Sequence, residues 1–374
     1  MNDASNIDII VSGHLCLDLI PDMAHVPPGD LATPGRLHEV GPLTISTGGV
    51  VSNTGLALHR LGADVRLMAT VGSDLLGRVI IASLKDRDPH LGEFITVQPG
   101  LDSSYTIVLA PSRADRTFLH CAGANSAFSA ANVDFALLRR AKLFHLGYPP
   151  ILPRLIADDG ASLSRLYQQA RDAGAVTSLD MTLPDPKGPS GQADWKTILQ
   201  RTLPYVDIFL PSIEEIVFML RRSDYEAWNG VVRDRVNRAY VTDLADELLA
   251  LGVAVAGFKL GELGMFLKTA RTSRIAQMSR LPIDPYAWSE QTVYTPAFAV
   301  DVVNTLGAGD SAYAGFLAAL VRGLSPQACL TWACAVGACN CEAADATSGV
   351  RSWDETQQRI DQGWPLHHAR LTGI

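Results

Sequence analysis

Short apolar runs alternate with longer amphipathic stretches along most of this chain of 374 residues. The runs are rich in Val, Ile and Leu, as buried strands are, and the stretches between them carry apolar residues at helical spacing. Strands are predicted at residues 7–11, 65–71, 142–146, 175–180, 208–210, 255–260 and 265–268. Helices are predicted at residues 51–61, 76–84, 155–173, 213–220 and 244–251. This order favours parallel strands joined by crossover helices, hence an α/β fold with helices on both faces of a sheet.

Two early segments interrupt the alternation. Residues 14–46 are rich in Pro and Gly and resemble a loop, whereas residues 103–122 alternate like antiparallel strands, with apolar side chains on one face. Both lie among the first strand–helix units. We therefore expect them to protrude together from the edge of the sheet as a small second layer.

The last third of the chain has a different character. Residues 270–296 are irregular, and we expect a surface insertion there. From Gly309 onward the chain is almost wholly helical, with helices predicted at 309–322 and 326–344. No repeat or low-complexity tract divides the chain, so we predict a single domain over residues 1–374.

Charge and composition exclude several classes of protein. The formal net charge of −8 gives no basic footprint for nucleic acid. No apolar run approaches the ~20 residues of a membrane span, and the acidic N-terminus does not resemble a signal peptide. The six cysteines are too unevenly placed for a disulfide framework, and the four within residues 329–341 are interpreted as small core residues. These observations predict a cytoplasmic protein without nucleic-acid or membrane partners.

The most informative segment runs from Asn304 to Leu317 and reads NTLGAGDSAYAGFL. Gly307, Ala308 and Gly309 allow a sharp turn into a helix, where successive N–H groups and the helix dipole create a pocket for anionic oxygen. Asp310 follows in the first helical turn. A carboxylate that can accept the proton of a hydroxyl, beside donors that can hold phosphate, is the arrangement that phosphoryl transfer requires.

Two other interpretations fit this segment alone. Its glycines loosely match a dinucleotide fingerprint, but the following residues are helical and apolar, without the strand and acidic residue that such a site needs. Asp310 could also serve only as a cap for its helix, with the glycines making a tight turn.

A second segment, residues 46–63, reads STGGVVSNTGLALHRLGA and leads into a predicted helix. Gly48 and Gly49 lack a Cβ atom and so permit a ligand to approach the backbone closely. Asn53 offers both a donor and an acceptor to hydroxyl groups. Taken alone, a Gly-Gly pair before a helix is more often a simple turn.

Residues 46–63 resemble the N-terminal signature of the ribokinase-like (PfkB) carbohydrate and nucleoside kinases. Residues 304–317 resemble the C-terminal signature of the same family, which is commonly written D-T-x-G-A-G-D. The resemblance spans about residues 7–345. It implies a three-layer α/β/α sandwich with a small β lid, formed here by residues 14–46 and 103–122. It also implies an ATP- and Mg²⁺-dependent kinase, with Asp310 as catalytic base and Gly307–Gly309 as anion hole.

The resemblance carries further residues into the expected site. Those expected to bind substrate are Asp18, Gly48, Gly49, Asn53 and Asn125. Those expected to bind the nucleotide are Lys259, Gly261, Glu215 and Asn340, and Glu215 is also expected to organise Mg²⁺ indirectly. On local sequence alone, Glu215 would rather be a solvated helix residue and Asp18 a turn residue.

Several positions depart from the family pattern. Asn304 stands at the first Asp of D-T-x-G-A-G-D, which in some members belongs to a monovalent-cation site, so a K⁺ requirement is left open. Ser212 stands at the Asn of the N-x-x-E motif that contains Glu215. The residues after Asp180 differ from the D-x-N-x-R of many fructokinase and ketodeoxygluconate kinase relatives. A phosphorylated substrate would call for basic residues near the lid, where Arg113 and Arg116 stand.

The function predicted from the sequence is therefore the ATP-dependent phosphorylation of a hydroxyl on a sugar or sugar-like molecule. A nucleoside kinase of the same fold and a catalytically inactive, ligand-binding relative are the alternatives. An NAD-dependent oxidoreductase is a third hypothesis, which stabilisation by NAD rather than ATP would support. A homodimer formed through the lid is a further expectation, because a small β layer leaves an edge or an apolar face to cover.

Overall fold

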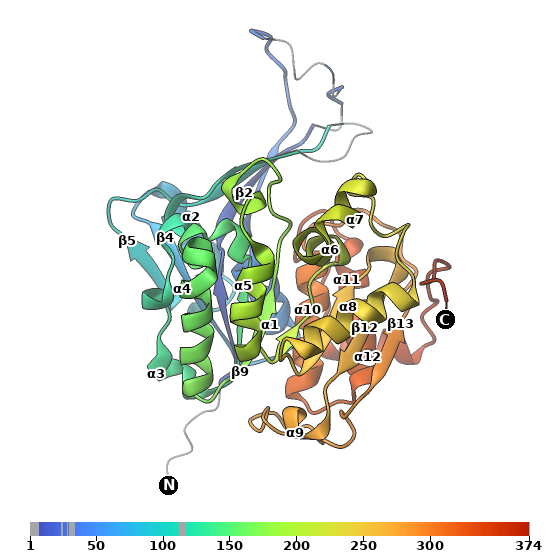
Figure 1. The fold of residues 1–374 in the computed structure, drawn as a ribbon. Coiled ribbons are helices and arrows are strands. Elements are labelled where there is room, and N and C mark those ends of the chain that lie inside the picture. Colours follow the sequence, from blue (N-terminus) through green and yellow to red (C-terminus); the bar gives the residue numbers. More distant parts are fainter. Residues whose placement is uncertain (1–6, 24, 28, 30–33, 112–116, 374) are drawn as a thin grey trace.

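A computed structural model describes residues 7–23, 25–27, 29, 34–111 and 117–373. Its main sheet has nine strands in the order β13-β12-β11-β10-β9-β8-β1-β4-β5 (Figure 1). The strands are β1 (Ile7–Gly13), β4 (Val65–Gly72), β5 (Ile95–Gln98), β8 (Ala141–Gly147), β9 (Val176–Asp180), β10 (Ile208–Phe209), β11 (Val255–Lys259), β12 (Met265–Thr269) and β13 (Thr292–Thr295). All the predicted strands are present, whereas β5 and β13, at the two edges, were not predicted.

The direction of the strands decides where a site can form. From β11 to β5 neighbouring strands pair in parallel, while β12 and β13 are antiparallel additions at one edge. The chain first adds β4 on one side of β1 and later β8 on the other. The carboxyl ends of β1 and β8 thus flank the point at which the order of the strands reverses, where open α/β sheets bind their ligands.

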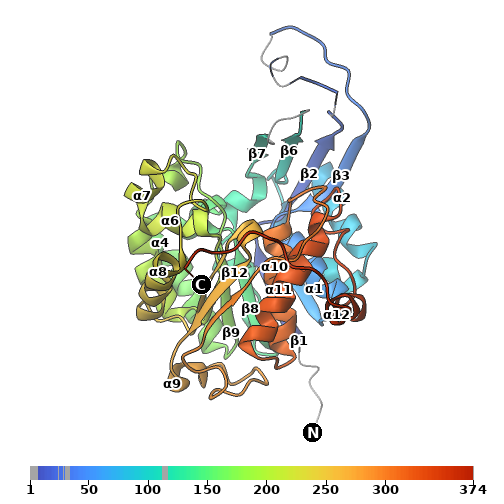
Figure 2. The same ribbon diagram turned by 90° about the vertical axis from the view of Figure 1, so that its right-hand side faces the viewer.

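Helices cover both faces of this sheet (Figure 2). One face packs against α1 (Val50–Arg60), α2 (Leu75–Lys85), α10 (Ala308–Val321) and α11 (Pro326–Cys341). The other packs against α3 (Phe135–Leu138), α4 (Pro153–Asp172), α5 (Trp195–Thr202), α6 (Ile213–Leu220) and α8 (Arg238–Ala250). The remaining helices are α7 (Arg222–Ala227), α9 (Thr272–Ile275) and α12 (Trp353–Asp361). The predicted three-layer α/β/α sandwich is confirmed.

A second, four-stranded sheet rises from one end of the sandwich (Figure 2). Its order is β3-β2-β6-β7, formed by β2 (Cys16–Pro21), β3 (Leu43–Gly48), β6 (Tyr105–Leu109) and β7 (Thr117–Cys121). The two segments expected to form a second layer do meet in one sheet. The expectation of a loop over residues 14–46 is wrong where β2 and β3 lie. Arg113 and Arg116 lie outside the described residues.

The register of the second sheet aligns four polar residues. Asp18 of β2 pairs with Ser46 of β3 on one side and with Thr106 of β6 on the other, and Thr106 pairs with His120 of β7. Directly paired residues point to the same side of a sheet. We call the side that carries this row the palm face of the second sheet.

Residues 270–296 differ from the surface insertion expected there. Their side chains Ile275, Met278, Leu281 and Trp288 are buried in the hydrophobic core, and β13 closes one edge of the main sheet. The segment is therefore part of the core. Helix α4 also differs from prediction, since its backbone is non-helical from Ala157 to Gly160. Among the described residues, no helix is both long enough and apolar enough to span a membrane.

Candidate active site

The residues of the candidate site gather where the parallel strands end. His14 directly follows β1 and Tyr148 directly follows β8, on either side of the reversal in strand order. Asp180 is the last residue of β9, and Lys259 is the last residue of β11. Because the carboxyl ends of parallel strands share one edge of the sheet, residues distant in sequence meet there.

Asp310 lies in the first turn of α10 and is buried, with 3% of its surface exposed. One carboxylate oxygen accepts a hydrogen bond of 2.9 Å from the Asn53 side-chain amide, and the other accepts one of 2.7 Å from the Tyr148 hydroxyl. The early Gly-Gly segment and the late glycine turn, predicted to form one site, are thus joined by a direct contact.

The surroundings of Asp310 have opposing effects on the pKa of its carboxyl group. Burial raises the pKa of Asp310, while the hydrogen bonds from Tyr148 and Asn53 and the charge of Lys259 lower it. Burial is the larger effect, and the pKa lies above the ordinary value for an aspartate. A carboxylate with a raised pKa is a better proton acceptor, provided that it remains ionised at the working pH.

Gly307 makes the turn into α10 in the left-handed region, with φ of 70°. A Cβ atom built on it would lie 2.6 Å from the carbonyl oxygen of Ala346, so only glycine fits. Asn340, predicted to contact the nucleotide, donates to the carbonyl of Leu306 at 2.8 Å, while its Oδ1 is buried without a hydrogen-bond partner among the described residues. Asn304 accepts from the Leu306 N–H at 2.6 Å and donates to the carbonyl of Ala344. Both asparagines therefore hold the loop that precedes the helix.

Lys259 places an ammonium group beside this helix N-terminus. A Cβ atom on Gly309 would lie 3.6 Å from Lys259 Nζ. The same Nζ donates to Asp180 Oδ1 at 2.6 Å, and both side chains are buried. Burial alone would lower the pKa of Lys259, but the charges of Asp180 and Glu215 outweigh it and raise that pKa, so the amine stays charged. Backbone N–H groups and one cation together make a site for phosphate.

Two further carboxyl groups lie around Lys259. Burial raises the pKa of Asp180 to about 6, against the attraction of Lys259. It raises the pKa of Glu215 to about 8, again against Lys259. Asp180 Oδ2 is buried without a hydrogen-bond partner, while Glu215 accepts from the Ser212 N–H at 2.8 Å. Partly neutralised acidic groups beside a phosphate pocket fit a divalent cation that arrives with the phosphates.

The same residues do not form a complete metal cage. The described part of the chain contains no group of three or more His, Cys, Asp or Glu side chains suited to hold a metal ion. Mg²⁺ commonly keeps several waters and binds through one or two carboxylates and the substrate phosphates. The acidic groups therefore fit Mg²⁺ only as a partner of a bound nucleotide, and the indirect role of Glu215 stays a prediction.

Side chains of the protein itself pack against the two glycines of the early segment. A Cβ atom on Gly48 would lie 2.1 Å from Asp18 Oδ2, and one on Gly49 would lie 2.4 Å from His14 Nδ1. Gly49 also holds φ of 81°, which disfavours any side chain. Asp18 is buried on the palm face, and burial raises its pKa to about 6.

Asn53 and Asn125, both predicted to bind substrate, differ in how much of their hydrogen-bonding capacity is already used. Asn53 gives its amide N–H to Asp310, while its Oδ1 is buried without a partner. Asn125 donates to the Leu15 carbonyl at 2.8 Å and accepts from the Leu15 N–H at 3.4 Å. Asn53 can thus still accept a hydrogen bond, whereas Asn125 fastens the junction between β1 and β2.

Gly261 lies in the turn after Lys259, with φ of 59°. A Cβ atom on it would lie 2.4 Å from Arg233 Nη1. The Arg233 guanidinium bridges Glu214 at 2.6 Å and Glu262 at 2.5 Å. The turn predicted to face the nucleotide thus packs against Arg233, whose charge is already balanced by these two glutamates.

Three residues of the site were not predicted from the sequence. They are His14, Tyr148 and Asp180. Asp180 was noted only as the end of a strand, and no local motif distinguishes His14 or Tyr148. What they share is a position at the carboxyl end of a central strand, and strand order would have been needed to recognise it. Tyr148 carries a further sign, φ of 66°, which a non-glycine residue seldom adopts outside functional or tightly constrained sites.

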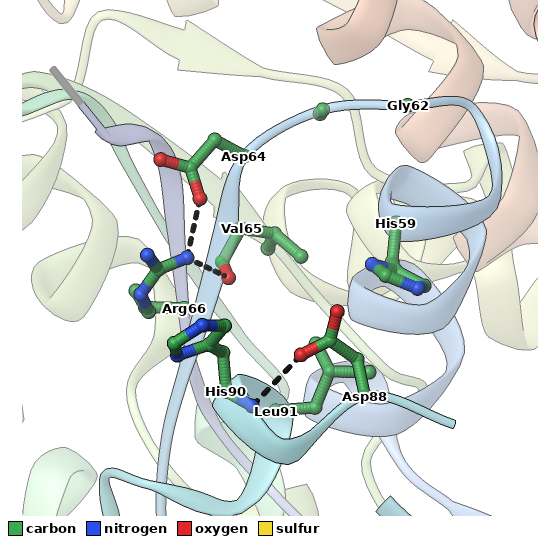
Figure 3. A pocket seen from close by; sticks show the side chains of 9 residues that line it. His59, Gly62, Asp64, Val65, Arg66, Asp88, His90 and Leu91 are labelled. Carbon is green, nitrogen blue, oxygen red and sulfur yellow. Dashed lines mark hydrogen bonds and ion pairs between the residues drawn. The ribbon is translucent and has the colours of Figure 1, made fainter. Parts of the chain in front are cut away.

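Two surface hollows lie elsewhere. The larger, about 340 Å³, lies at the start of β4, at the amino rather than the carboxyl end of the strand (Figure 3). It is lined by His59, Gly62, Ala63, Asp64, Val65, Arg66, Asp88, His90 and Leu91. The other, about 320 Å³, lies beside β5 and is lined in part by Phe94, Ile95 and Thr96. Neither contains any residue of the candidate site.

Comparison with known proteins adds independent findings. The profile of the family described as "pfkB family carbohydrate kinase" matches residues 6–353. A probable chloroplastic fructokinase-6 of Arabidopsis thaliana is 23% identical over 320 residues, which cover 85% of this chain and 71% of the relative. The 2-dehydro-3-deoxygluconokinase of Bacillus subtilis is 24% identical over 342 residues, covering 90% and 93%.

Solved structures share the fold. The fructokinase of Xylella fastidiosa, solved with bound ATP, superposes with a TM-score of 0.72 at 17% identity. The match covers 96% of this chain and 99% of that one. At so low an identity, this likeness bears on the fold alone.

Proposed function

This chain belongs to the pfkB family of carbohydrate kinases, and from that membership we propose that it transfers the γ-phosphoryl group of ATP to a hydroxyl of a free sugar, with Asp310 as general base. The observation that carries the assignment is the contact of 2.9 Å between Asn53 and Asp310, which joins the acceptor and phosphate sides of one site. The glycine turn at the start of α10 and the Lys259 ammonium support a phosphate position beside that carboxylate.

In the proposed step, the acceptor oxygen forms a bond to the γ-phosphorus while the bond from that phosphorus to the β–γ bridging oxygen breaks. The bridging oxygen leaves with the electron pair as part of ADP. Asp310 accepts the hydroxyl proton, so charge does not build up on the attacking oxygen. The N–H groups at the start of α10, together with Lys259, stabilise negative charge on the transferring group.

Mg²⁺ would be held by the phosphates together with Glu215 and Asp180, directly or through water. When bound, it supplies positive charge that neutralises the phosphate oxygens. The contribution of the protein is to hold these two acidic groups next to Lys259, which prevents their charges from repelling the nucleotide.

We expect the proposed reaction not to require K⁺. The Asn304 side chain uses its amide N–H on the Ala344 carbonyl and its oxygen on the Leu306 N–H. An amide thus ties the two loops beside the anion hole without adding a charge for a cation to balance. Equal turnover with and without K⁺ is the expected result.

Opening of the second sheet is a necessary part of this function. Asp310 and His14 are both buried, with 3% of each exposed, so an acceptor can reach them only if something moves. The palm face lies against His14, since the ring centroid of His120 is 5.0 Å from that of His14. We therefore propose that this sheet opens to admit the acceptor and closes to exclude water from the reaction.

The test is ADP release from ATP and Mg²⁺ across a panel of sugars and nucleosides, followed by Asp310→Asn with the best acceptor. The substitution keeps the shape of the side chain but cannot accept the proton, so turnover should fall about 10²–10⁴-fold. Stabilisation of the protein by ATP against heating should persist.

The matched control is Asp246→Asn, which alters an exposed carboxylate on α8 that is paired with Lys268 of β12. Near-normal turnover by Asp310→Asn would refute the base assignment. ATP-induced stabilisation with no ADP release for any acceptor would indicate an inactive, ligand-binding relative instead.

A further inference from the structure

His14 is a buried imidazole with neither ring nitrogen hydrogen-bonded to any described residue. Only 3% of its surface is exposed. Leaving a buried polar atom unpartnered is unfavourable, so such groups in a folded protein call for an explanation. Burial lowers the pKa of His14 well below its ordinary value, and the ring is neutral, with one donor and one acceptor to offer.

The position of the ring indicates what it could meet. Its centroid lies 5.0 Å from that of His120 on the palm face and 6.1 Å from that of Tyr148, which holds Asp310. Its Nδ1 lies against Gly49, the residue before α1, and Asn53 on that helix has its own unpartnered Oδ1. Unpartnered polar atoms on His14 and Asn53 therefore lie near the proposed base.

The palm face adds a row of hydroxyl-binding groups. Ser46, Asp18, Thr106 and His120 are direct neighbours across four strands, and the Ser46 hydroxyl is buried without a partner. A hydrogen bond of 3.1 Å joins Thr106 Oγ1 and His120 Nδ1. A row of neighbouring side chains that can donate and accept hydrogen bonds suits a molecule with several hydroxyl groups.

Among the described residues, the charges around this row do not favour an anion. Asp18 interacts with Asp310 and with Cys16 and Thr106, and no described Lys or Arg affects it. The groups that affect His14 and His120 include no described Lys or Arg either. Lys259, the cation of the site, is held by Asp180 on the phosphate side. A carboxylate or phosphate on the acceptor would thus be buried beside Asp18 without a compensating charge from any described residue, and burying an uncompensated charge is strongly unfavourable.

We propose that the His14 imidazole contacts the acceptor directly and, with Asp18 and His120, restricts it to an uncharged polyhydroxylated molecule, so that sugar acids and sugar phosphates are rejected. The inference rests on the proposed function, since it assigns the acceptor class of the same site. It also separates the chain from one of its relatives, whose name specifies a sugar acid as substrate.

The first experiment compares acceptors that differ in charge. D-Fructose and other neutral sugars are measured against D-fructose 6-phosphate and 2-dehydro-3-deoxygluconate, with the intact chain, ATP and Mg²⁺. We expect kcat/KM to be at least ~100-fold higher for the best neutral acceptor. An anionic acceptor that matches or exceeds it would overturn the inference and leave the kinase function standing.

The second experiment tests His14 itself. His14→Ala should raise the KM for the neutral acceptor by about tenfold or more, while the KM for ATP changes less than about twofold. His120→Ala, on an exposed strand of the second sheet, should act in the same direction and carries little risk to folding. His59→Ala, which lies in the remote hollow, is the matched control. An unchanged acceptor KM in both His14→Ala and His120→Ala would overturn the proposal.

A binding measurement separates the inference from the proposed function. Neutral acceptors alone, without ATP, should raise the Tm of the wild-type protein and raise that of His14→Ala less. If they do so but no ADP is ever released, the kinase function fails and the recognition by His14 stands. If no acceptor, neutral or anionic, changes the Tm or releases ADP, both fail.

Discussion

Asp310 illustrates how a buried carboxylate can be held in place without being inactivated. Each of its two oxygens accepts one hydrogen bond, from Asn53 and from Tyr148. A carboxylate oxygen has a second lone pair, so a substrate hydroxyl can still donate to either one. The backbone of Tyr148 stays in the left-handed region while its hydroxyl makes this contact. Strain at one residue therefore accompanies the orientation of another.

Asp18 shows the opposing demands of binding and stability, and Asp18→Asn should stabilise the protein in the absence of substrate. Burial raises the pKa of the folded Asp18 to about 6, against about 3.9 in the unfolded chain. Between these values the folded state binds the proton more strongly, so its stability falls as pH rises through this window. The full penalty, at most ~3 kcal/mol, is reached above about pH 6.

This expectation is checked by measuring the Tm of both proteins from pH 4 to pH 7.5 without ligands. The advantage of Asp18→Asn should be small at pH 4, grow towards pH 6 and then level off. Asp246→Asn, on an exposed carboxylate, should show no such trend. An advantage of the same size at every pH would mean that ionisation of Asp18 is not its cause.

At the scale of elements, the start of α10 combines a glycine turn with the proposed anion pocket and the proposed base. The turn depends on Gly307 for two reasons, its φ of 70° and the closeness of the Ala346 carbonyl. Asn340 and Asn304 brace the loop before it. The helix therefore begins at a fixed place relative to Lys259.

Gly307→Ala should weaken both stability and nucleotide turnover. The left-handed backbone alone costs about 1 kcal/mol, and the contact with Ala346 adds a steric cost. Gly363→Ala is a matched control, because Gly363 has φ of 79° but no atom within 4 Å of its would-be Cβ. We expect a larger loss of Tm for Gly307→Ala, and a higher KM for ATP in that variant only. Equal effects of the two substitutions would show that the backbone angle is the whole cause.

Elements with strong local patterns could be predicted, and those shaped by their surroundings could not. Strands buried on both faces, such as β1 and β4, appear as apolar runs. β2 and β3 do not, because one of their sides carries the polar palm residues and Pro and Gly lie between them. Likewise, the meeting of Asp310 with the early Gly-Gly segment could be predicted from the two motifs. The positions of His14 and Tyr148 depend on which strands become neighbours, and no local pattern contains that order.

For the whole molecule, one side of the second sheet is left uncovered by the described residues. Leu43, Ile45 and Leu119 lie on the side opposite the palm face, and about half of each side chain is exposed. Near the root of this sheet the same side is covered by the main core, through Leu17. Exposed apolar side chains that line one side of a sheet call for a partner surface. We propose that a second copy of this chain covers it.

The expected result is a dimer in light scattering at micromolar concentration, which Ile45→Glu combined with Leu119→Glu converts to a monomer. Phe118→Glu is the matched control, because Phe118 neighbours Leu119 on β7, is equally exposed and lies on the palm side. A wild-type protein that is monomeric throughout, or a dimer that survives both charges, would disprove this arrangement.

The contact between Asn53 and Asp310 bridges 257 positions of the sequence. Closing so long a loop is entropically unfavourable and slows folding. On the ribosome, the proposed acceptor side is translated early, but the proposed base and anion pocket emerge only with α10 and the helices after it. We therefore expect a growing polypeptide to transfer no phosphoryl group until nearly all of it has been made, and a fragment cut before α10 to be inactive.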